Sequence, residues 1–269
     1  MNEIIFQTKD IVKRYKHVNV LDRINMTVKR GDIYGLIGEN GAGKTTLIRL
    51  LTGLANPSAG ELFLFGHQGK SIAGQRSRMG CIIEGPSLYS EMTAIENLEV
   101  QRLQRGIPGK ENLDHVLALV HLDHAGKKKV KNFSLGMRQR LALAIALLGT
   151  PEFLVLDEPI NGLDPVGILE LRNLLKSLNK DMGITILISS HILSELNQLA
   201  TKYGILSHGE LMQEIDAKEL EKQCQKHLYL KVSDASKVAS LLELELHTHN
   251  YRVLPDNSIC LYDYLDAPE

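Results

Sequence analysis

The sequence Gly38-Glu39-Asn40-Gly41-Ala42-Gly43-Lys44-Thr45 fits the pattern GxxxxGK[ST]. A short apolar run precedes it at residues 32–37, and residues 44–54, at its end, have helical apolar spacing. A strand, a glycine-rich loop and a helix in this order are the context in which the pattern forms a phosphate-binding loop. The sequence therefore predicts an α/β fold with a phosphate site between this strand and this helix.

The residue types in the loop suit an anion. Glycines let consecutive backbone N–H groups turn inward, and the following helix adds about half a positive charge at its N-terminus. Lys44 adds a full charge, and the Thr45 hydroxyl is placed to ligate Mg²⁺, which prefers hard oxygen ligands. The alternative is a glycine-rich turn that binds no ligand. Packing alone does not explain a Lys and a Thr at these two positions, so this alternative is disfavoured.

Other apolar runs bounded by turn residues predict buried strands at residues 60–65, 79–83, 152–156 and 184–189. Several of them are too apolar for half-exposed strands, so we expect a largely parallel sheet. Amphipathic stretches alternate with these runs and predict helices that cover the sheet, at residues 93–105, 110–122, 134–148, 165–179 and 192–200.

One of these strands ends in two adjacent carboxylates, in the stretch FLVLDEP at residues 153–159. Neighbouring residues on a strand point to opposite faces, so Asp157 and Glu158 should have different roles. One would reach a metal through water, and the other an attacking water. Alone, the pair could equally cap a helix or be solvated. Together with the phosphate loop it favours the functional interpretation.

The composition argues against several other classes. The 269 residues carry 31 Lys and Arg against 32 Asp and Glu, whereas a protein that acts mainly on nucleic-acid phosphates is strongly basic. An odd number of widely spaced cysteines indicates neither a disulfide framework nor a zinc site and fits a reducing cytosol: Cys81, Cys224 and Cys260. We expect no signal peptide and no membrane span, because we find neither a leader nor an apolar run of about 18 residues.

The pattern changes after residues 205–214, where Ser-His-Gly suggests a hairpin turn. Polarity rises through residues 216–225, where we expect a linker helix. The remainder predicts a small α+β appendage at residues 216–269, with a strand at 227–232, a helix at 235–244 and a hairpin around Pro255-Asp256-Asn257. This part has too few residues for a robust core of its own.

From Ile4 to about Glu214 the chain resembles the ATP-binding subunits of ABC transporters. The two motifs above are similar to the Walker A and Walker B motifs of that family, and the stretch SLGMRQR at residues 134–140 resembles its signature sequence. This stretch departs from the common LSGGQ at Phe133, Leu135 and Met137 but keeps the Ser and the second Gly.

The resemblance implies a P-loop nucleotide-binding domain at residues 1–215, with a mainly parallel sheet, an antiparallel β subdomain and a helical subdomain at about 86–150. It also implies an ATPase that uses ATP with Mg²⁺. The residues expected to bind ATP are the adenine-stacking candidate Tyr15 and Gly38, Asn40, Gly41, Ala42, Gly43, Lys44, Thr45 and Thr46.

The same resemblance assigns the catalytic and metal-binding roles. Glu158 would act as the general base, and His191 would orient the water and the γ-phosphate. The metal would be held by Thr45, Glu84 and Asp157. The alternatives are that Tyr15 covers a sheet edge and that His191 has a structural role only.

Ser134 opens an apolar helix, so its simplest role is an N-cap. A helix start with a small side chain is also an anion site. The resemblance implies that Ser134, Gly136 and Gln139 contact ATP held by a second subunit, head to tail and most simply in a homodimer, while Asp164 belongs to the D-loop that links the two sites. It further implies integral membrane permease subunits as partners, a cytoplasmic location on the inner face of the cell membrane, and no nucleic acid.

Glu84 stands where the family carries Gln in its Q-loop. A carboxylate attracts a metal more strongly than an amide does, so we expect tighter Mg²⁺ dependence and altered coupling rather than lost hydrolysis. The alternative is a Glu tolerated in the same role. This Glu and the signature stretch resemble the subgroup that exports lantibiotics, bacitracin and related antimicrobial peptides for immunity or resistance. Subunits of that subgroup often run longer, so the chain is expected to be either a short member or one truncated at its C-terminus.

Three other functions stay open at this point. One is a soluble ABC-type ATPase that acts on nucleic acid or ribosomes, although the tandem cassettes, coiled-coil insertions or basic extensions common in such proteins are not seen. Another is a P-loop kinase or GTPase, but the guanine-reading NKxD pattern does not occur. The third is a nucleotide sensor that hardly hydrolyses ATP, against which Glu158 and His191 argue.

Overall fold

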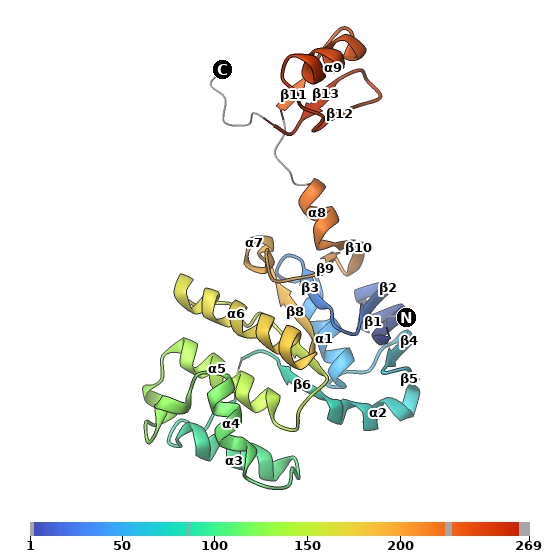
Figure 1. Ribbon diagram of the computed structural model, residues 1–269. Helices are drawn as coiled ribbons and strands as arrows, with labels where there is room; N and C mark the ends of the chain where they lie inside the picture. Colours follow the sequence, from blue (N-terminus) through green and yellow to red (C-terminus); the bar gives the residue numbers. More distant parts are fainter. Residues whose placement is uncertain (1–2, 86, 224–227, 264–269) are drawn as a thin grey trace. The chain divides into compact units, whose positions relative to one another are not determined.

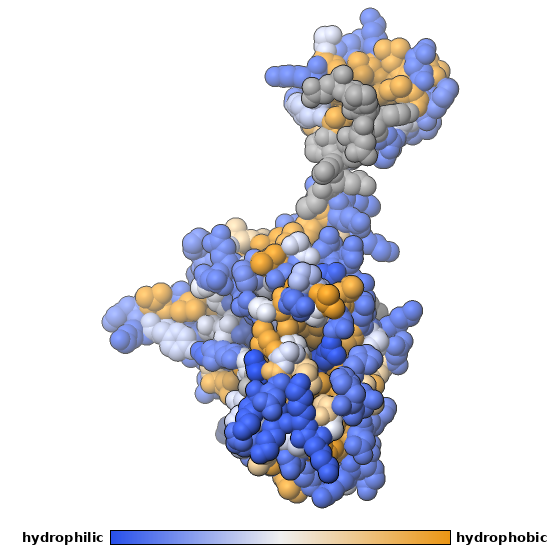
Figure 2. Space-filling view, turned by 90° about the vertical axis from the view of Figure 1, so that its left-hand side faces the viewer, coloured by the Kyte–Doolittle hydropathy of each residue, from blue (hydrophilic) through white to orange (hydrophobic). Residues whose placement is uncertain are grey.

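The computed structural model describes residues 3–85, 87–223 and 228–263, which form two compact units (Figure 1). The larger unit is Met1–Ala217 and the smaller is Lys218–Glu269. No helix in the described residues is both long enough and apolar enough to span a membrane. On the face shown in Figure 2, hydrophobic side chains lie scattered among hydrophilic ones.

A six-stranded sheet forms the centre of the larger unit, with the order β10-β9-β3-β8-β7-β6. All neighbours pair in parallel except β9 and β10, which form a hairpin across Ser207-His208-Gly209. The strands are β3 (Ile33–Ile37), β6 (Met79–Ile82), β7 (Phe153–Leu156), β8 (Thr185–Ser190), β9 (Lys202–Ser207) and β10 (Glu210–Asp216). The predicted parallel sheet and hairpin are thus confirmed.

A second sheet is antiparallel, with the order β2-β1-β4-β5. Its strands are β1 (Ile4–Tyr15), β2 (Val18–Lys29), β4 (Ala59–Leu64) and β5 (His67–Gln68). The prediction that residues 60–65 belong to the parallel sheet is wrong, because β4 pairs antiparallel with β1. Leu62 and Leu64 are buried while Glu61 is exposed and Phe63 partly so, the alternation of a strand with one solvated face.

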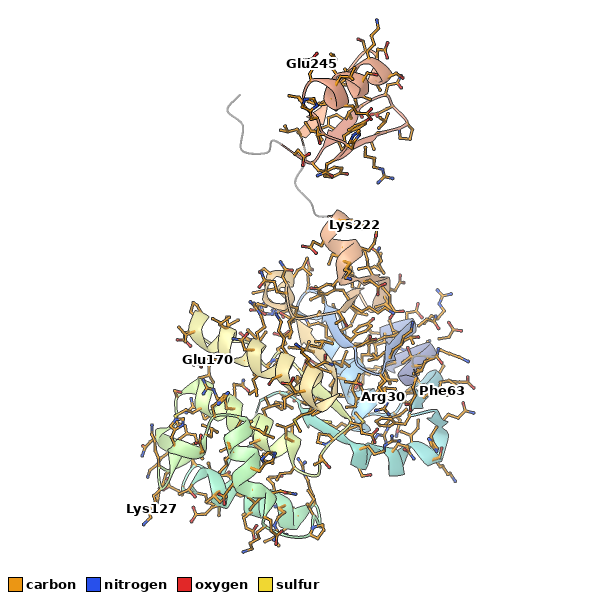
Figure 3. All side chains as sticks on the ribbon, viewed as in Figure 1. Arg30, Phe63, Lys127, Glu170, Lys222 and Glu245 are labelled. Carbon is orange, nitrogen blue, oxygen red and sulfur yellow. The ribbon has the colours of Figure 1, made fainter. Side chains whose placement is uncertain are left out.

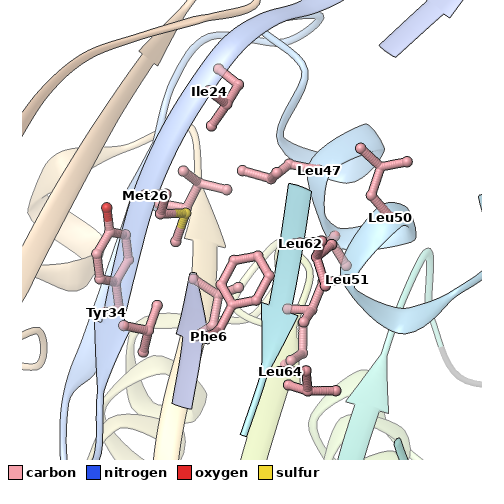
Figure 4. Packing of buried hydrophobic residues seen from close by; sticks show 14 of the residues in the cluster. Phe6, Ile24, Met26, Tyr34, Leu47, Leu50, Leu51, Leu62 and Leu64 are labelled. Carbon is pink, nitrogen blue, oxygen red and sulfur yellow. The ribbon is translucent and has the colours of Figure 1, made fainter. Parts of the chain in front are cut away.

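The core of the larger unit lies between the two sheets and helix α1 (Lys44–Thr52). Figure 4 shows how Phe6 and Met26 from the antiparallel sheet lie near Leu47 and Leu51 from α1. Burial of these side chains, each worth about 1.5–3 kcal/mol, fixes α1 and therefore the loop that begins it. The helix ends at Thr52, two residues earlier than its apolar spacing predicts, and Gly53 caps it with a φ of 83°.

Helices α3 (Ala94–Gln104), α4 (Asn112–Leu119) and α5 (Leu135–Leu147) lie together (green in Figure 1), and α5 packs on β6. Helix α6 (Pro165–Met182) follows β7. The helix predicted at residues 192–200 is mostly wrong, because α7 spans only Leu193–Leu196 and Asn197 turns extended. The remaining short elements are α2 (Ile72–Gln75) and the 3₁₀ turns η1 (Gly69–Ser71), η2 (Arg76–Arg78), η3 (Asp123–Ala125) and η4 (Val130–Asn132).

The smaller unit begins within α8 (Ala217–Gln223), which forms where a linker helix was predicted. Its three-stranded antiparallel sheet has the order β11-β13-β12. The elements are β11 (Leu228–Leu230), α9 (Ala235–Leu244), β12 (Tyr251–Val253) and β13 (Ile259–Leu261). They confirm the predicted helix and hairpin and a strand that ends at Leu230, two residues earlier than predicted, while His227 lies outside the described residues. Cys81 and Cys260 are free thiols, and Cys224 also lies outside the described residues.

Candidate functional site

The conformation of the phosphate loop requires glycine at two positions, because a side chain would not fit there. A Cβ on Gly38 would lie 2.3 Å from the Leu206 carbonyl oxygen, and Gly43 has a φ of 110° where it caps α1. The Lys44 ammonium donates hydrogen bonds to the carbonyl oxygens of Gly38 at 2.6 Å and Glu39 at 3.1 Å. With 4% of its surface exposed, Lys44 is held inside the loop and not in bulk solvent.

The other predicted loop residues surround this lysine. Ala42 is buried, and its N–H donates to the Glu39 carbonyl at 3.1 Å. Asn40 and Gly41 are exposed, and Thr46 lies partly buried in the first turn of α1. The loop therefore presents its backbone at the N-terminus of a buried helix, which is the geometry that accommodates phosphate.

The end of β7 brings hard oxygen donors to this helix. The Thr45 hydroxyl donates to Asp157 Oδ2 at 2.8 Å, and the Ser189 hydroxyl donates to Asp157 Oδ1 at 2.6 Å. Asp157 is buried, and its own N–H donates to the Ile82 carbonyl. These oxygens suit Mg²⁺, which uses one or two protein ligands and completes its shell with phosphate and water. No cluster of three or more His, Cys, Asp or Glu that could hold a metal occurs in the described part of the chain.

Glu158 contacts other residues than Asp157 does, as expected for neighbours with different roles. Its backbone has a φ of 46°, rare for a residue with a side chain, and its N–H donates to the Ser189 hydroxyl at 2.9 Å. One carboxylate oxygen lies 3.3 Å from the Lys44 ammonium, and the other lies 2.9 Å from Nδ1 of His191. The fold thus brings Lys44, Glu158 and His191 together, although 147 residues separate the first from the last.

Ser189 is a site residue that the sequence analysis did not identify. Its hydroxyl joins the carboxylate of Asp157 to the backbone of Glu158, so it sets the positions of both acids. The available signal was a buried strand, β8, that ends in two hydroxyl residues beside the strand that ends in Asp-Glu.

The signature segment forms a separate surface. The Ser134 hydroxyl accepts from the Met137 N–H at 3.2 Å, so it is the N-cap of α5 as its simplest role predicts. Asp164 likewise caps α6, accepting from the Gly167 N–H at 3.2 Å. A hollow of about 400 Å³ lies between the two helix starts, lined by residues that include Ser134, Gly136, Gln139, Leu163 and Asp164.

Two side chains mark the walls of this hollow. The Gln139 Oε1 atom is buried and has no hydrogen-bond partner in the described part of the structure. Glu170, which Figure 3 labels on α6, forms an ion pair with Arg140 of α5. The ion pair ties the signature helix to the helix that follows the D-loop.

Tyr15 stands at the end of β1, paired with Val18 across the hairpin. Its ring is 46% exposed, and the Lys13 ammonium lies 4.8 Å from the ring centre. The same hairpin reaches the phosphate loop, because a Cβ on Gly43 would lie 3.0 Å from the Val20 carbonyl oxygen. The exposure leaves a ring face available for stacking, and the adenine role stays a prediction.

Glu84 is not brought to the other predicted metal ligands. Its carboxylate forms an ion pair with Arg49 of α1, and no hydrogen bond joins it to Thr45 or Asp157 within the described residues. Arg49 is the second residue that the sequence analysis missed.

Cys81 lies on β6, the strand that precedes Glu84. Burial raises the pKa of its thiol to about 11, so the thiol is neutral at physiological pH. A neutral, largely buried thiol is a poor nucleophile.

A buried strand, a phosphate loop, and a second strand that ends in two carboxylates define the larger unit as a P-loop ATPase domain. The family model described as "ABC transporter" matches residues 21–161, and the chain belongs to that family. It is an ATP-binding subunit of the ABC type, an ATPase with the cassette fold, as the resemblance implied. The family assignment also removes the P-loop kinase and GTPase alternatives.

Individual relatives agree with this assignment. The chain is 47% identical over 262 residues to the bacitracin transport ATP-binding protein BcrA of Bacillus licheniformis, covering 97% of this chain and 86% of that protein. It is 40% identical over 210 residues to the lantibiotic transport ATP-binding protein SrtF of Streptococcus pyogenes, covering 78% of this chain and 90% of that protein. A solved ATP-binding subunit of an ABC transporter superposes with a TM-score of 0.71 at 30% identity, covering 81% of this chain and 92% of the other.

Proposed function

We propose that this chain powers the export of an antimicrobial peptide of the bacitracin or lantibiotic type through a separate membrane permease, and so confers immunity or resistance. The observation that carries the proposal is the 47% identity with a bacitracin transport ATP-binding protein over 97% of this chain. The likeness to a lantibiotic transport ATP-binding protein points to the same kind of cargo. In this role the chain lies on the cytoplasmic face of the membrane, bound to its permease.

The contacts of the site residues support the roles that we propose for them. Lys44 and the loop backbone bind the phosphates, and Tyr15 stacks on the base. Thr45 and Asp157 would hold Mg²⁺, which supplies positive charge to the phosphates. Glu84, which pairs with Arg49 in this structure, is proposed to reach the metal as the third ligand only when nucleotide is bound. Glu158 accepts a proton from the attacking water, and His191, whose Nδ1 lies 2.9 Å from that carboxylate, orients the water and the γ-phosphate. A positioned general base contributes about 10²–10⁴-fold to a rate.

A second copy completes the site in this proposal. Ser134 and Gly136 of one copy contact the terminal phosphate that the loop of the other copy holds, and Gln139 and Asp164 lie beside that contact. The exposed Ser134 and the hollow beside it support this role, because they leave the start of α5 open to a ligand. ATP and ADP differ only in the γ-phosphate, so contacts to that group decide whether the pair closes.

The surface that meets the permease is proposed to include residues 84–97. Beside this segment, α3 and α4 enclose a hollow of about 480 Å³. Its lining combines the apolar Met92, Ile95, Val100 and Leu113 with the charged Glu91, Glu96, Glu99 and Lys110. A lining of apolar and charged side chains together suits the docking of an amphipathic segment.

The dimer is tested with Glu158→Gln, which should trap ATP between two copies. Sizing with saturating ATP and Mg²⁺ should show a dimer that ADP does not produce. A purified variant that stays monomeric under these conditions would contradict the paired site.

The cargo is tested in a bacterium sensitive to bacitracin and lantibiotics. Expression of the chain with the membrane proteins encoded beside it should raise the inhibitory concentration of at least one such peptide, and Lys44→Met should abolish the gain. The rival function, a soluble ATPase acting on ribosomes or nucleic acid, predicts no protection and co-sedimentation with ribosomes instead of membranes.

A further inference from the structure

The ion pair between Arg49 and Glu84 joins α1 to the loop that leaves the sheet after β6. The guanidinium donates to Glu84 Oε1, and both side chains are partly exposed, at 39% and 58%. Glu84 has a φ of 57° and the next residue, Gly85, a φ of 92°. A non-glycine residue keeps such a backbone at a cost in free energy, and the ion pair with Arg49 is one contact that Glu84 makes in this conformation.

Arg49 shares a face of α1 with the candidate metal ligand Thr45. The partly exposed residues Thr45, Arg49 and Thr52 have the spacing i, i+4, i+7, whereas Leu47 and Leu51 are buried. Four residues of helix advance about 6 Å. Arg49 therefore lies one helical turn beyond Thr45, whose hydroxyl donates to Asp157, on the same partly exposed face of α1.

The two acids that this face of α1 contacts follow neighbouring strands. Ile82 of β6 pairs with Leu156 of β7, and both strands run in parallel. Asp157 comes one residue after β7 and Glu84 two residues after β6, so both leave the same edge of the sheet. One face of α1 thus reaches both acids, Asp157 through Thr45 and Glu84 through Arg49.

We infer that Arg49 is a positioning residue that keeps the Glu84 carboxylate away from the metal position until Mg²⁺ and nucleotide compete for it. An amide at position 84 would make a much weaker contact with a guanidinium, so this competition is specific to the carboxylate. The inference rests on the proposed metal role of Glu84. This inference changes the effect expected from having Glu instead of the family's Gln at position 84. Because Arg49 competes for the Glu84 carboxylate, the dependence on Mg²⁺ should tighten less than the carboxylate alone would predict.

The test measures the Mg²⁺ concentration that half-saturates binding of a fluorescent, non-hydrolysable ATP analogue to the full chain. Arg49→Met should lower this midpoint about two- to fivefold, the range of an exposed ion pair. Arg49→Lys, which retains the charge, should stay near the wild-type value. In a Glu84→Gln background, Arg49→Met should leave the midpoint unchanged.

A second measurement needs no nucleotide. Amide hydrogen exchange of the peptide that covers residues 83–88 should be faster in Arg49→Met than in the wild type, and equal in Glu84→Gln with and without Arg49→Met. The matched control is Arg23→Met, which removes one exposed positive charge from β2, where the Arg23 side chain is 74% exposed. It should change neither measurement.

The outcomes separate this inference from the proposed function. If Glu84→Gln alone leaves the Mg²⁺ midpoint at the wild-type value, the metal role of Glu84 is wrong. If Glu84→Gln raises the midpoint but Arg49→Met does not lower it, only the role of Arg49 is wrong. Equal shifts from Arg49→Met in both backgrounds, or from Arg23→Met, would assign the effect to net charge and overturn the inference.

Discussion

The Lys44 ammonium lies 3.3 Å from Glu158 Oε1, so the positive charge of the phosphate loop pairs with the negative charge of the carboxylate proposed as the general base. A triphosphate in the loop carries more negative charge than one carboxylate and competes for the same ammonium. Glu158 would then keep His191 as its partner, 2.9 Å away. In the proposed mechanism, this contact would make the availability of Glu158 as a base depend on whether the loop holds a triphosphate.

Lys44→Met should weaken binding of a fluorescent ATP analogue at least tenfold, because a hydrogen bond to a charged group contributes about 1.5–3 kcal/mol. Equilibrium titration measures the effect. Lys70→Met, which removes an exposed lysine from η1, serves as the control and should bind like the wild type. Unchanged affinity in Lys44→Met would contradict the phosphate role of the loop.

Ser189→Ala should lower the free energy of unfolding by about 1–3 kcal/mol, because it leaves the buried Asp157 Oδ1 and the Glu158 N–H without this partner. It should also reduce phosphate release, since both acids lose their support. Urea unfolding and a phosphate-release assay measure the two effects. Ser77→Ala, which loses only an exposed hydrogen bond to the Gly74 carbonyl, should change neither. If Ser189→Ala is as stable as the wild type, the hydrogen bonds of Ser189 to Asp157 and Glu158 do not contribute to stability.

The ion pairs of Glu152 predict an acid-sensitive contribution to stability. Hydrogen bonds from Arg78 and then Arg30 lower the pKa of Glu152 from 4.5 to about 2. The folded-state pKa lies below the unfolded one, so the contribution is complete above pH 4.5 and is lost as the pH falls toward 2.

Glu152→Gln should therefore destabilise the protein at pH 7 by on the order of 1 kcal/mol, a value reduced for the 38% exposure of the side chain. The difference from the wild type should shrink steadily between pH 4.5 and pH 3. Urea unfolding across this range measures it, with the exposed Glu61→Gln as control. A difference that does not depend on pH would rule out the ionic origin.

Gly80→Ala should destabilise the packing of α5 on β6. A Cβ at Gly80 would lie 2.1 Å from the Ala146 carbonyl oxygen and 2.8 Å from Leu154 Cδ2, so backbone has to move. Overpacking of this kind costs about 1–3 kcal/mol, which thermal or urea unfolding detects. The control, Gly74→Ala, meets no atom within 4 Å and stands in helix α2, where Ala is favoured by up to about 1 kcal/mol. Equal stability of the two variants would disprove the close approach.

Much of the fold could be predicted because its determinants are local. The runs at residues 32–37, 79–83, 152–156 and 184–189 became parallel strands, since nearly every side chain in them is apolar and buried. Residues 60–65 did not, because the strand alternates buried and exposed positions and pairs with β1. The amphipathic pattern overestimated α7, where the chain turns extended at Asn197 before β9.

The sequence by itself determined the phosphate loop and the paired acids, because glycine spacing, an apolar strand and two charges can be recognised without distant contacts, and the resemblance of residues 134–140 to the signature sequence pointed to the family. Only the tertiary structure decided that Ser189 bridges Asp157 and Glu158, that Lys44 meets Glu158, and that Glu84 pairs with Arg49. These contacts depend on the order of strands in the sheet and on the face that α1 turns toward their ends. A linear pattern does not carry that order, because it follows from how the buried surfaces pack together.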